Sequence, residues 1–276
     1  MVQQLGQFLN LQAGSIEEYQ KFLSEVLQAE WERNGDPTVV YTVVYPILQR
    51  GQHLLDDTFA QLLQQWARNV FSQGKPEEVA GIVGVIQNLC VDIQNFPLGS
   101  RANNLEIAIT GYQTVLEVRT RDAFPYEWAS VQNNLGNAYS DRIRGERADN
   151  LELAIVAYNL SLEVYTRDAD AFPYEWASVQ NNLGTAYSNR IRGERADNLE
   201  LAIVSLSQSL EVRTREAFPY EWASSQNNLG ATYGNRIRGE RADNLELAIA
   251  AYNLSLEVYT RDADAFPYEW ASVQNN

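Results

Sequence analysis

The chain has 276 residues, and its 21 Lys and Arg against 36 Asp and Glu give a formal net charge of -15. This balance makes nucleic acid an unlikely partner, because phosphate affinity comes from clustered basic side chains, and the 45% of apolar residues excludes a disordered or collagen-like chain. A single cysteine, Cys90, and a single histidine, His53, exclude an internal disulfide and a multi-histidine metal site, so we expect no metal and no cofactor.

The first 15 residues lack the basic, apolar and small-residue succession of a signal peptide. No stretch reaches the roughly 18 apolar residues that span a bilayer. Together with the lone cysteine, these features predict a cytoplasmic protein with no membrane partner.

Residues 1–74 are predicted to form an N-terminal helical cap. Three helix starts are marked by side chains that accept hydrogen bonds from free backbone N–H groups: Ser15 paired with Glu18, Asp36 before Pro37, and Asp56 or Asp57. The first helix is expected to end near Gly35 and the third near Gly74.

Pro46 lies within the second of these segments and should kink or split its helix, because proline cannot donate the backbone hydrogen bond. The β-branched pairs in Val39–Tyr41 and Val43–Tyr45 leave a strand open as the alternative.

From residue 75 the sequence repeats. Phe-Pro-Tyr-Glu-Trp-Ala begins at Phe124, Phe172, Phe218 and Phe266, in steps of 48, 46 and 48 residues. Asn-Leu-Glu begins at Asn104, Asn150, Asn198 and Asn244, in steps of 46, 48 and 46. These patterns predict repeat units at 75–123, 124–171, 172–217 and 218–265, followed by a truncated unit at 266–276.

Each unit is predicted to be a pair of helices. The first opens at Pro125 and buries a stripe that includes Leu135 and Tyr139, and the second opens at Asp149, which has Glu152 three residues later. Neither helix buries its stripe alone, so neighbouring pairs must stack into an all-α solenoid. The last unit stops at Asn276 within a first helix, which suggests that the chain is a fragment.

At six positions the unit at 124–171 resembles the tetratricopeptide repeat: Leu135, Gly136, Tyr139, Ala154, Ile155 and Tyr158. The resemblance implies a right-handed α-solenoid with small residues where the helices of a pair approach closely. It also implies that the first helices line a concave groove. The 46- and 48-residue units are longer than the ~34 residues of a standard repeat.

The combination of Phe-Pro-Tyr-Glu-Trp-Ala, Gln-Asn-Asn-Leu-Gly, Arg-Ile-Arg-Gly-Glu-Arg-Ala and Asn-Leu-Glu is similar to the arrays that precede CHAT domains, which are caspase-like peptidase modules, in cyanobacterial proteins. Asn34–Pro37 and Phe59–Trp66 are similar to the leader of those proteins. The sequence carries no CHAT domain. The resemblance therefore implies a recognition or scaffolding segment rather than an enzyme.

Polar residues share one face of the predicted first helices, opposite the buried stripe. Asparagine amides both donate and accept, which suits the N–H and C=O groups of an extended peptide. A solvated face that merely repeats is the alternative. The predicted peptide-binding groove consists of Ser130, Asn133, Asn137, Ser140, Ser178, Asn181, Thr185, Ser188, Ser224 and Asn227.

The loops between the helices carry three arginines that recur in every complete unit. If stacking of the units aligned these arginines along one edge of the solenoid, they would bind an anion. Pairing with the Glu and Asp of each loop is the alternative that we favour. These arginines are Arg142, Arg144, Arg147, Arg190, Arg192, Arg195, Arg236, Arg238 and Arg241.

The remaining candidates have structural interpretations. Cys90 replaces the repeat glycine at a close helix contact and is expected to be a small buried residue rather than a nucleophile paired with His53. Tyr126 and Trp128 are expected to pack between repeats. The sequence thus predicts a scaffold that binds a protein or peptide, with self-association through the array ends as the alternative.

Overall fold

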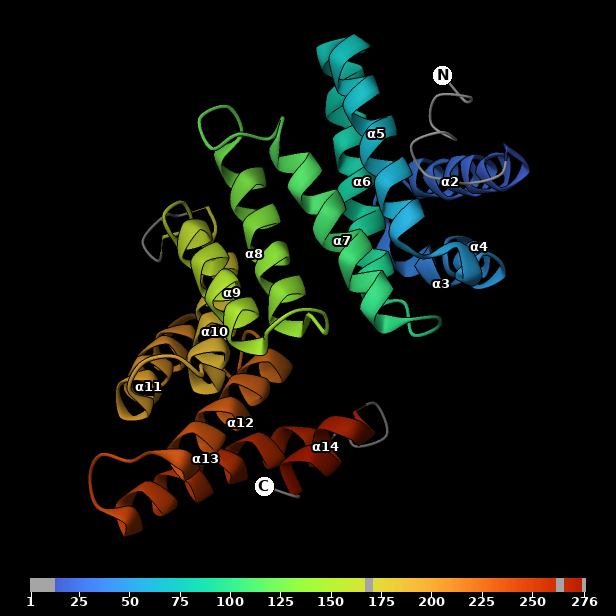
Figure 1. Cartoon of the computed structure of the whole chain (residues 1–276). Helices are drawn as coiled ribbons and strands as arrows, with labels where there is room; N and C mark the ends of the chain where they lie inside the picture. The colour runs from blue at the N-terminus through green and yellow to red at the C-terminus, as the bar shows by residue number, and fades with distance from the viewer. Residues whose placement is uncertain (1–12, 167–170, 262–265, 275–276) are drawn as a thin grey trace. The chain divides into compact units, whose positions relative to one another are not determined.

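The structure is a computed structural model that describes residues 13–166, 171–261 and 266–274. Within these ranges the regular structure is helical, and no strand occurs (Figure 1). The chain divides into two compact units, Met1–Arg147 and Ala148–Asn276. The all-α prediction is confirmed for the described residues. Residues 167–170 and 262–265, where two of the predicted repeat units end, lie outside them.

The first unit begins with helices that do not follow the repeat. They are α2 (Ala13–Arg33), α3 (Val40–Val43), α4 (Tyr45–Arg50) and α5 (Asp57–Gln73), with short 3₁₀ turns at Pro37–Val39 and Gln52–Leu54. The predicted cap residues are confirmed at two starts. The Asp36 side chain accepts from the Thr38 N–H, and that of Asp56 accepts from the N–H groups of Thr58 and Phe59.

The segment around Pro46 is helical but divided, as its proline predicts. The chain leaves α3 at Val43 and enters α4 at Tyr45, with Pro46 in the first turn of α4. Proline fits that position because a first-turn N–H has no partner inside the helix. The strand alternative for Val39–Tyr45 is wrong, since these residues form helical turns.

Helix pairing also begins in the first unit. α6 (Pro76–Asn95) packs against α7 (Arg101–Leu116), and α7 contacts both α5 and α8 (Pro125–Asp141). α6 matches the predicted first helix of repeat 75–123, and α8 starts at the proline that predicted it. Inside the α6–α7 pair, the Cys90 sulfur lies where a side chain on Gly111 would point.

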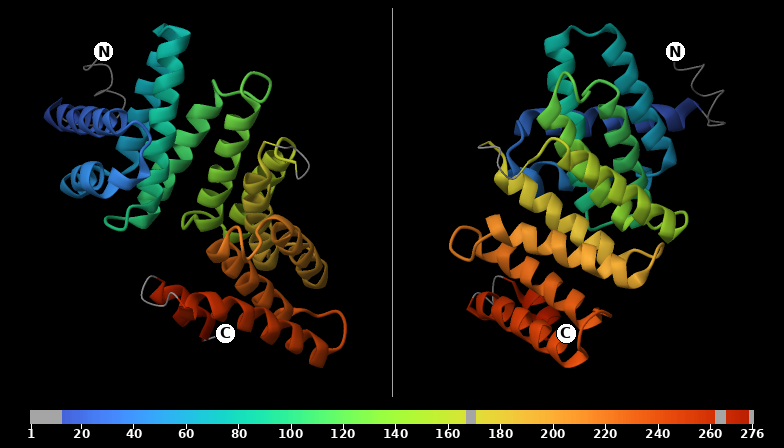
Figure 2. Two further views of the ribbon diagram at one scale, coloured as in Figure 1. Left: turned by 180° about the vertical axis from the view of Figure 1, so that it is seen from behind. Right: turned by 90° about the vertical axis from the view of Figure 1, so that its left-hand side faces the viewer.

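The second unit contains the more regular pairs. After α9 (Arg147–Leu162), α10 (Pro173–Asn189) packs against α11 (Arg195–Val212), and α12 (Pro219–Asn235) packs against α13 (Arg241–Arg261). α11 contacts α12, and α13 contacts α14 (Pro267–Gln274), so each pair rests on the next. The turned views in Figure 2 show the same neighbours in the orange-to-red part of the chain.

The repeat glycines Gly184 and Gly230 lie where the two helices of their pairs touch. A Cβ on Gly184 would come within 2.7 Å of Leu206 Cγ, and one on Gly230 within 2.8 Å of Tyr252 Cδ1. Both glycines are on the first helix, and both contacts are on the second. The close approach implied by the resemblance to tetratricopeptide repeats is therefore present in these two pairs.

The predicted start of the second helix in each repeat requires a correction. The helix α9 begins at Arg147, two residues before the predicted cap Asp149, and α11 begins in the same way at Arg195. Asp149 therefore lies inside the first turn, where its carboxylate binds Arg192 of the following loop. Asp149 thus forms an ion pair instead of capping the helix. Local spacing does not reveal this pair, because its two residues are far apart in the sequence.

Among the described helices, none is both long and apolar enough to cross a membrane.

Candidate binding surfaces of the helix pairs

The first arginine of each inter-helix loop binds the glutamate of the preceding second helix with two hydrogen bonds. Arg190 Nε and Nη2 each lie 2.7 Å from an oxygen of Glu152. Arg236 holds Glu200 with the same two nitrogens at 2.8 Å, and Arg142 holds Glu106 at 2.8 Å. The fork of the guanidinium matches the two carboxylate oxygens, which fixes the angle as well as the distance.

The second arginine of each loop reaches the same preceding helix one turn earlier. Arg192 binds Asp149 and Arg238 binds Asp197. Arg144 places its nitrogens 2.6 Å from Asn103 Oδ1 and from Asp57 Oδ1.

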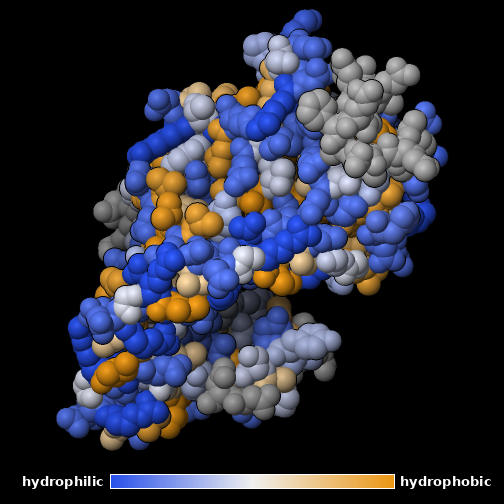
Figure 3. Space-filling view, in the orientation of Figure 1, coloured by the Kyte–Doolittle hydropathy of each residue, from blue (hydrophilic) through white to orange (hydrophobic). Residues whose placement is uncertain are grey.

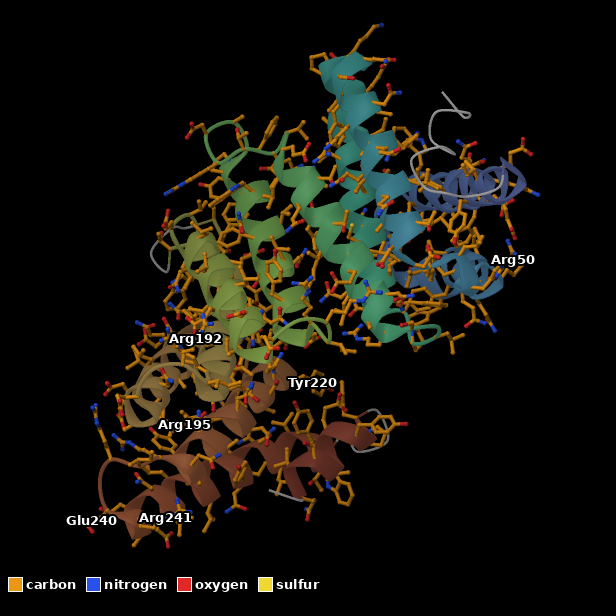
Figure 4. The ribbon with its side chains drawn as sticks, in the orientation of Figure 1. Arg50, Arg192, Arg195, Tyr220, Glu240 and Arg241 are labelled. Carbon is orange, nitrogen blue, oxygen red and sulfur yellow. The ribbon has the colours of Figure 1, made fainter. Side chains whose placement is uncertain are left out.

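The third arginine of each loop closes its own loop. Arg147, Arg195 and Arg241 donate to the main-chain carbonyls of Ser140, Ser188 and Gly234, at the ends of the preceding first helices. Each loop also contains a glycine at a φ of 79°, a conformation that glycine adopts without strain: Gly145, Gly193 and Gly239. Figure 4 labels two of these loops by Arg192 and Arg195 and by Glu240 and Arg241.

These contacts form an inter-pair clasp, by which we mean the first two loop arginines bound to the acidic or amide side chains of the preceding second helix. The acidic partners of the clasp lie one helix pair earlier. The favoured sequence interpretation, which placed these partners in the same loop as the arginines, is therefore wrong for the clasp. The arginine hydrogen bonds hold the pKa values of Glu152 and Glu200 below the ordinary glutamate range.

The predicted groove residues of α10 are largely engaged with the next first helix. Asn181 is 9% exposed, and its Oδ1 accepts from Ser225 Oγ at 3.1 Å and from Asn228 Nδ2 at 3.2 Å. Ser188 Oγ accepts from Thr232 at 3.4 Å, and Thr185 donates to the Asn181 carbonyl at 3.0 Å. This part of the polar ladder joins α10 to α12.

A buried arginine lies beside that contact. Arg213, 7% exposed, donates to Ser178 Oγ at 2.8 Å and to Ser225 Oγ at 3.3 Å. Its guanidinium stands 5.6 Å from the centre of the Tyr174 ring, and burial lowers its pKa. One pair later the equivalent position holds Tyr259, which is buried with Val273 and Ala223.

The last two predicted groove residues of the second unit line a hollow. Ser224 and Asn227 border a space of about 270 Å³ together with Tyr259 of α13 and with Tyr268, Glu269, Ser272 and Val273 of α14. The wall is mixed, with amide, hydroxyl and aromatic groups and one carboxylate. Here the structure brings predicted residues together around an open volume.

The predicted groove residues of the first unit lie on α8 and are half-buried. Gln87 of α6 donates to Ser130 Oγ at 3.4 Å, and the Ser140 carbonyl accepts from Arg147. Asn133 and Asn137 lie on the same helix and each has a polar or ring interaction.

A larger groove in the first unit was not predicted from the sequence. It has a volume of about 530 Å³ between α2, α5 and α6, and Trp31 and Trp66 stand in its wall. No charged side chain is among its lining residues, which are Gln20, Leu23, Ser24, Leu27, Gln28, Trp31, Leu62, Gln65, Trp66, Asn69, Ile82 and Val85. These helices lie outside the repeat, so no periodic signal marked their apolar face.

A buried ion cluster in the first unit was also missed. Arg33 Nε lies 2.7 Å from Glu30 Oε2, and its Nη2 lies 2.7 Å from Asp92 Oδ2, with all three side chains at least nine-tenths enclosed. Burial and the neighbouring Asp92 raise the pKa of Glu30 to about 8. Glu30 and Asp92 come from α2 and α6, so only the fold brings them together.

The repeated aromatic residues pack between successive pairs of the second unit. The ring of Tyr174 lies 4.9 Å from that of Phe218, and Tyr220 lies 4.2 Å from Phe266. In the first unit the Trp128 ring is 5.7 Å from the guanidinium of Arg121, while Tyr126 is exposed. On the face shown in Figure 3, hydrophobic residues stand in separate patches among hydrophilic ones.

Cys90 and His53 lie in unrelated surroundings. Cys90 is fully buried, and that burial raises the pKa of its thiol. His53 is exposed and lies 3.4 Å from Glu18. Among the described residues, no group of His, Cys, Asp and Glu side chains has the arrangement of a metal site.

Comparison with known proteins supports the fold alone. No protein-family model and no curated protein matches the chain. Among solved structures, the crystal structure of BtubC (BKLC) from P. vanneervenii is similar, with a TM-score of 0.55 and 18% sequence identity over 89% of this chain and 91% of that chain. The likeness agrees with an α-helical repeat architecture.

Proposed function

We propose that the chain is a non-enzymatic protein-interaction scaffold that binds an extended peptide segment along its first helices. Helical repeat folds generally serve as interaction scaffolds, because stacking presents the same helix face several times. The proposal includes right-handed stacking within each unit, a capping role for residues 1–74, and service as the recognition arm of a CHAT-type peptidase.

The observation that carries the proposal is the hollow at the end of the polar ladder. Ser224 and Asn227 line it from α12, and an asparagine amide, which has both donor and acceptor groups, suits the N–H and C=O groups of a peptide backbone. The Tyr259 and Tyr268 side chains supply flat apolar area beside these polar groups.

Two features limit which peptides the hollow would bind and which residues would bind them. Glu269 lines the hollow, and the chain carries a net charge of -15, so a peptide with a Lys or Arg opposite Glu269 is favoured. Asn181 stabilises the packing of the helices rather than binding the ligand, because its amide oxygen already accepts hydrogen bonds from Ser225 and Asn228.

To test the proposal, a library of displayed random peptides is selected for binding to the intact chain. The affinities of the selected peptides are then measured by fluorescence anisotropy. Asn227→Ala should weaken the selected peptides about fivefold to tenfold, which corresponds to about 1 kcal/mol for a lost pair of backbone hydrogen bonds. The matched control is Asn253→Ala, because Asn253 is an exposed asparagine on α13 outside the hollow.

Selected peptides should also be enriched in basic residues, and Glu269→Gln should weaken them most at low salt. Equal binding to the Asn227 and Asn253 variants would remove the groove from the proposal. Failure to select any peptide would do the same.

Self-association through the array ends is the second candidate. One observation favours it: Leu245 and Ile249 of α13 are exposed apolar residues. Sedimentation over a range of concentrations tests it, and a constant monomer mass would exclude it.

A further inference from the structure

The second helices of the second unit expose an apolar residue at one repeated position. Leu153 of α9 is 42% exposed, and Leu201 of α11 and Leu247 of α13 are each 43% exposed. Three residues after the first two leucines, Val156 is 55% exposed and Val204 is 54% exposed. Positions three apart in an α-helix are neighbours, so these residues lie on one side of their helices. We call this side, defined by the five residues, the outer face.

The exposure of the outer face does not result from a missing neighbour. α11 packs against α10 before it and against α12 after it, and yet Leu201 and Val204 remain exposed. The core contacts of α11 lie on another side, where Leu199, Ala202 and Leu206 are fully buried. Stacking of the helix pairs therefore leaves the outer face of α11 uncovered.

The first unit contains a covered copy of the same position. Ile107 of α7 stands one repeat of 46 residues before Leu153 and is fully buried. Thr114 of α7, which lies on the same side of the helix as Ile107, is fully buried as well. The helix α5 packs along α7 (Figure 1). The molecule thus shows which kind of element covers this side of a second helix.

Contacts at both ends place α5 over Ile107. The Leu55 carbonyl, just before α5, accepts from Asn103 Nδ2 at 3.1 Å, and Gln64 of α5 donates to Thr114 at 3.4 Å. Asn103 and Thr114 lie on the same side of α7, one before Ile107 and one after it, so α5 passes over that residue. The two contacts follow the same order along both helices, which means that α5 and α7 run in the same direction.

An ion pair completes the contact near the C-terminal end of α5. Arg68 Nε lies 3.0 Å from each carboxylate oxygen of Glu117. In the second unit, Glu163 and Glu211 occupy the repeat position of Glu117, and both are exposed. A basic residue near the end of a docked helix would therefore meet a carboxylate beside the outer face of α9 and of α11.

We propose that the outer face is a docking site for amphipathic helices of a partner protein, each with an apolar stripe and a basic residue near its C-terminal end. The occupant is defined by α5, which covers the equivalent side of α7. The chain's own α5 is already packed on α7, and the same holds in every copy of the chain, so the helix must come from a different protein. The site lies on the second helices and does not depend on the peptide hollow beside α12.

The probe is a labelled peptide with the sequence of residues 56–73, which contains α5. A covalent link between Gln61 and Gln65, which are exposed and four residues apart, holds the peptide helical. Fluorescence anisotropy with the full chain measures its affinity, and we expect saturable binding. The peptide variant Leu63→Asp should lose this binding, because Leu63 lies on the side of α5 that faces Gly111 of α7.

The outer face is tested in the chain by one substitution in each of three helices. These substitutions should weaken peptide binding at least about tenfold, because each places a carboxylate against the apolar stripe of the peptide. They are Leu153→Asp, Leu201→Asp and Leu247→Asp. The matched control adds the same charges to exposed positions on another side of the same helices: Asn159→Asp, Ser207→Asp and Asn253→Asp.

Circular dichroism checks that both sets of variants keep the helix content of the parent chain. Serine at the same three leucine positions should weaken the peptide less than aspartate but in the same direction, and it replaces the aspartate set if that set impairs folding. Asn227→Ala, which tests the peptide hollow, should leave this binding unchanged, so the two proposals fail separately.

Equal affinity of the leucine variants and their matched control would assign the binding to general attraction and overturn the proposal. Absence of saturable binding by the linked peptide would overturn it too. Sedimentation of the chain without peptide tests a different occupant. Self-association that the leucine substitutions abolish, and that the control substitutions preserve, would identify a second copy on the outer face and contradict the proposed partner helix.

Discussion

Arg33 in the first unit and Arg236 in the second each bind a glutamate, but the two ion pairs differ in how much stability depends on them. The Arg33 side chain is 5% exposed and lies between the carboxylates of Glu30 and Asp92. Arg236 is about a quarter exposed and binds one carboxylate, that of Glu200, together with the side-chain oxygen of Asn244. Within the part of the chain that the structure describes, the buried cluster occurs once and joins α2 to α6. The exposed pair recurs because water at the surface keeps the cost of each pair small.

The comparison indicates which contacts make the stability of a unit depend on a single residue. A contact that repeats distributes its free energy over several weak equivalents, so the loss of one is tolerated. A unique buried cluster concentrates a large desolvation cost in a few groups, and removal of one partner leaves a charge uncompensated. The following predictions test this difference, beginning with the largest effect.

Arg33→Ala should lower the free energy of unfolding of the first unit by about 3–5 kcal/mol, because two carboxyl groups would remain buried with no counter-charge. The measurement is urea unfolding followed by helical circular dichroism. Arg50→Ala is the control, since Arg50 is an exposed arginine at the end of α4, and its effect should stay within about 0.5 kcal/mol. Similar losses in the two variants would contradict the comparison.

Gly111→Ala should destabilise the α6–α7 pair by about 1–3 kcal/mol, because the added Cβ would overlap the sulfur of Cys90. The double variant Gly111→Ala with Cys90→Ala should recover most of the loss, since the two Cβ atoms would stand 3.8 Å apart. Urea midpoints of the wild type, both single variants and the double variant form the test. Additive losses would show that the two residues do not share the contact.

The two units should respond to pH in opposite directions. The pKa of Glu30 is raised to about 8, so the folded first unit binds this proton more tightly than the unfolded chain. Its stability should fall as pH rises from about 4.5 toward 8. The pKa values of Glu152 and Glu200 are lowered, so the second unit should lose stability as pH falls below about 4.5.

Hydrogen exchange read by mass spectrometry separates the two responses, because peptides from α6 and α11 report on different units. Glu30→Gln should flatten the alkaline loss in α6 and leave α11 unchanged. A common pH dependence of both segments, after correction for intrinsic exchange rates, would refute the assignment.

The sequence predicts those parts of the fold that depend on local rules. Pro125 and Asp56 mark helix starts because their effects are confined to the first turn. The repeat period predicts helix pairing because each pair has the same apolar stripe to bury. The glycine contact, present at Gly184 and Gly230, also follows from the repeat.

Features that depend on contacts between distant residues are missed. Asp149 has the spacing of a cap, but Arg192 binds it from the next loop and the helix begins earlier. Asn181 has the spacing of a groove residue, but Ser225 of the following helix covers it. The cluster around Arg33 joins non-repeated helices, so no periodicity identifies it.

The alternation of Arg213 and Tyr259 constrains how a gene of this kind can change length. Arg213 donates to Ser225 of the helix that follows it, whereas Tyr259 packs with Val273 of its own following helix. An arginine before a valine already occurs in the chain, since Arg119 stands at the position of Arg213 and is followed by Val131 at the position of Ser225. The combination that the chain lacks is a tyrosine before the serine. We therefore expect viable length variants of such a gene to avoid joining a second helix that ends in tyrosine to a first helix that carries the serine.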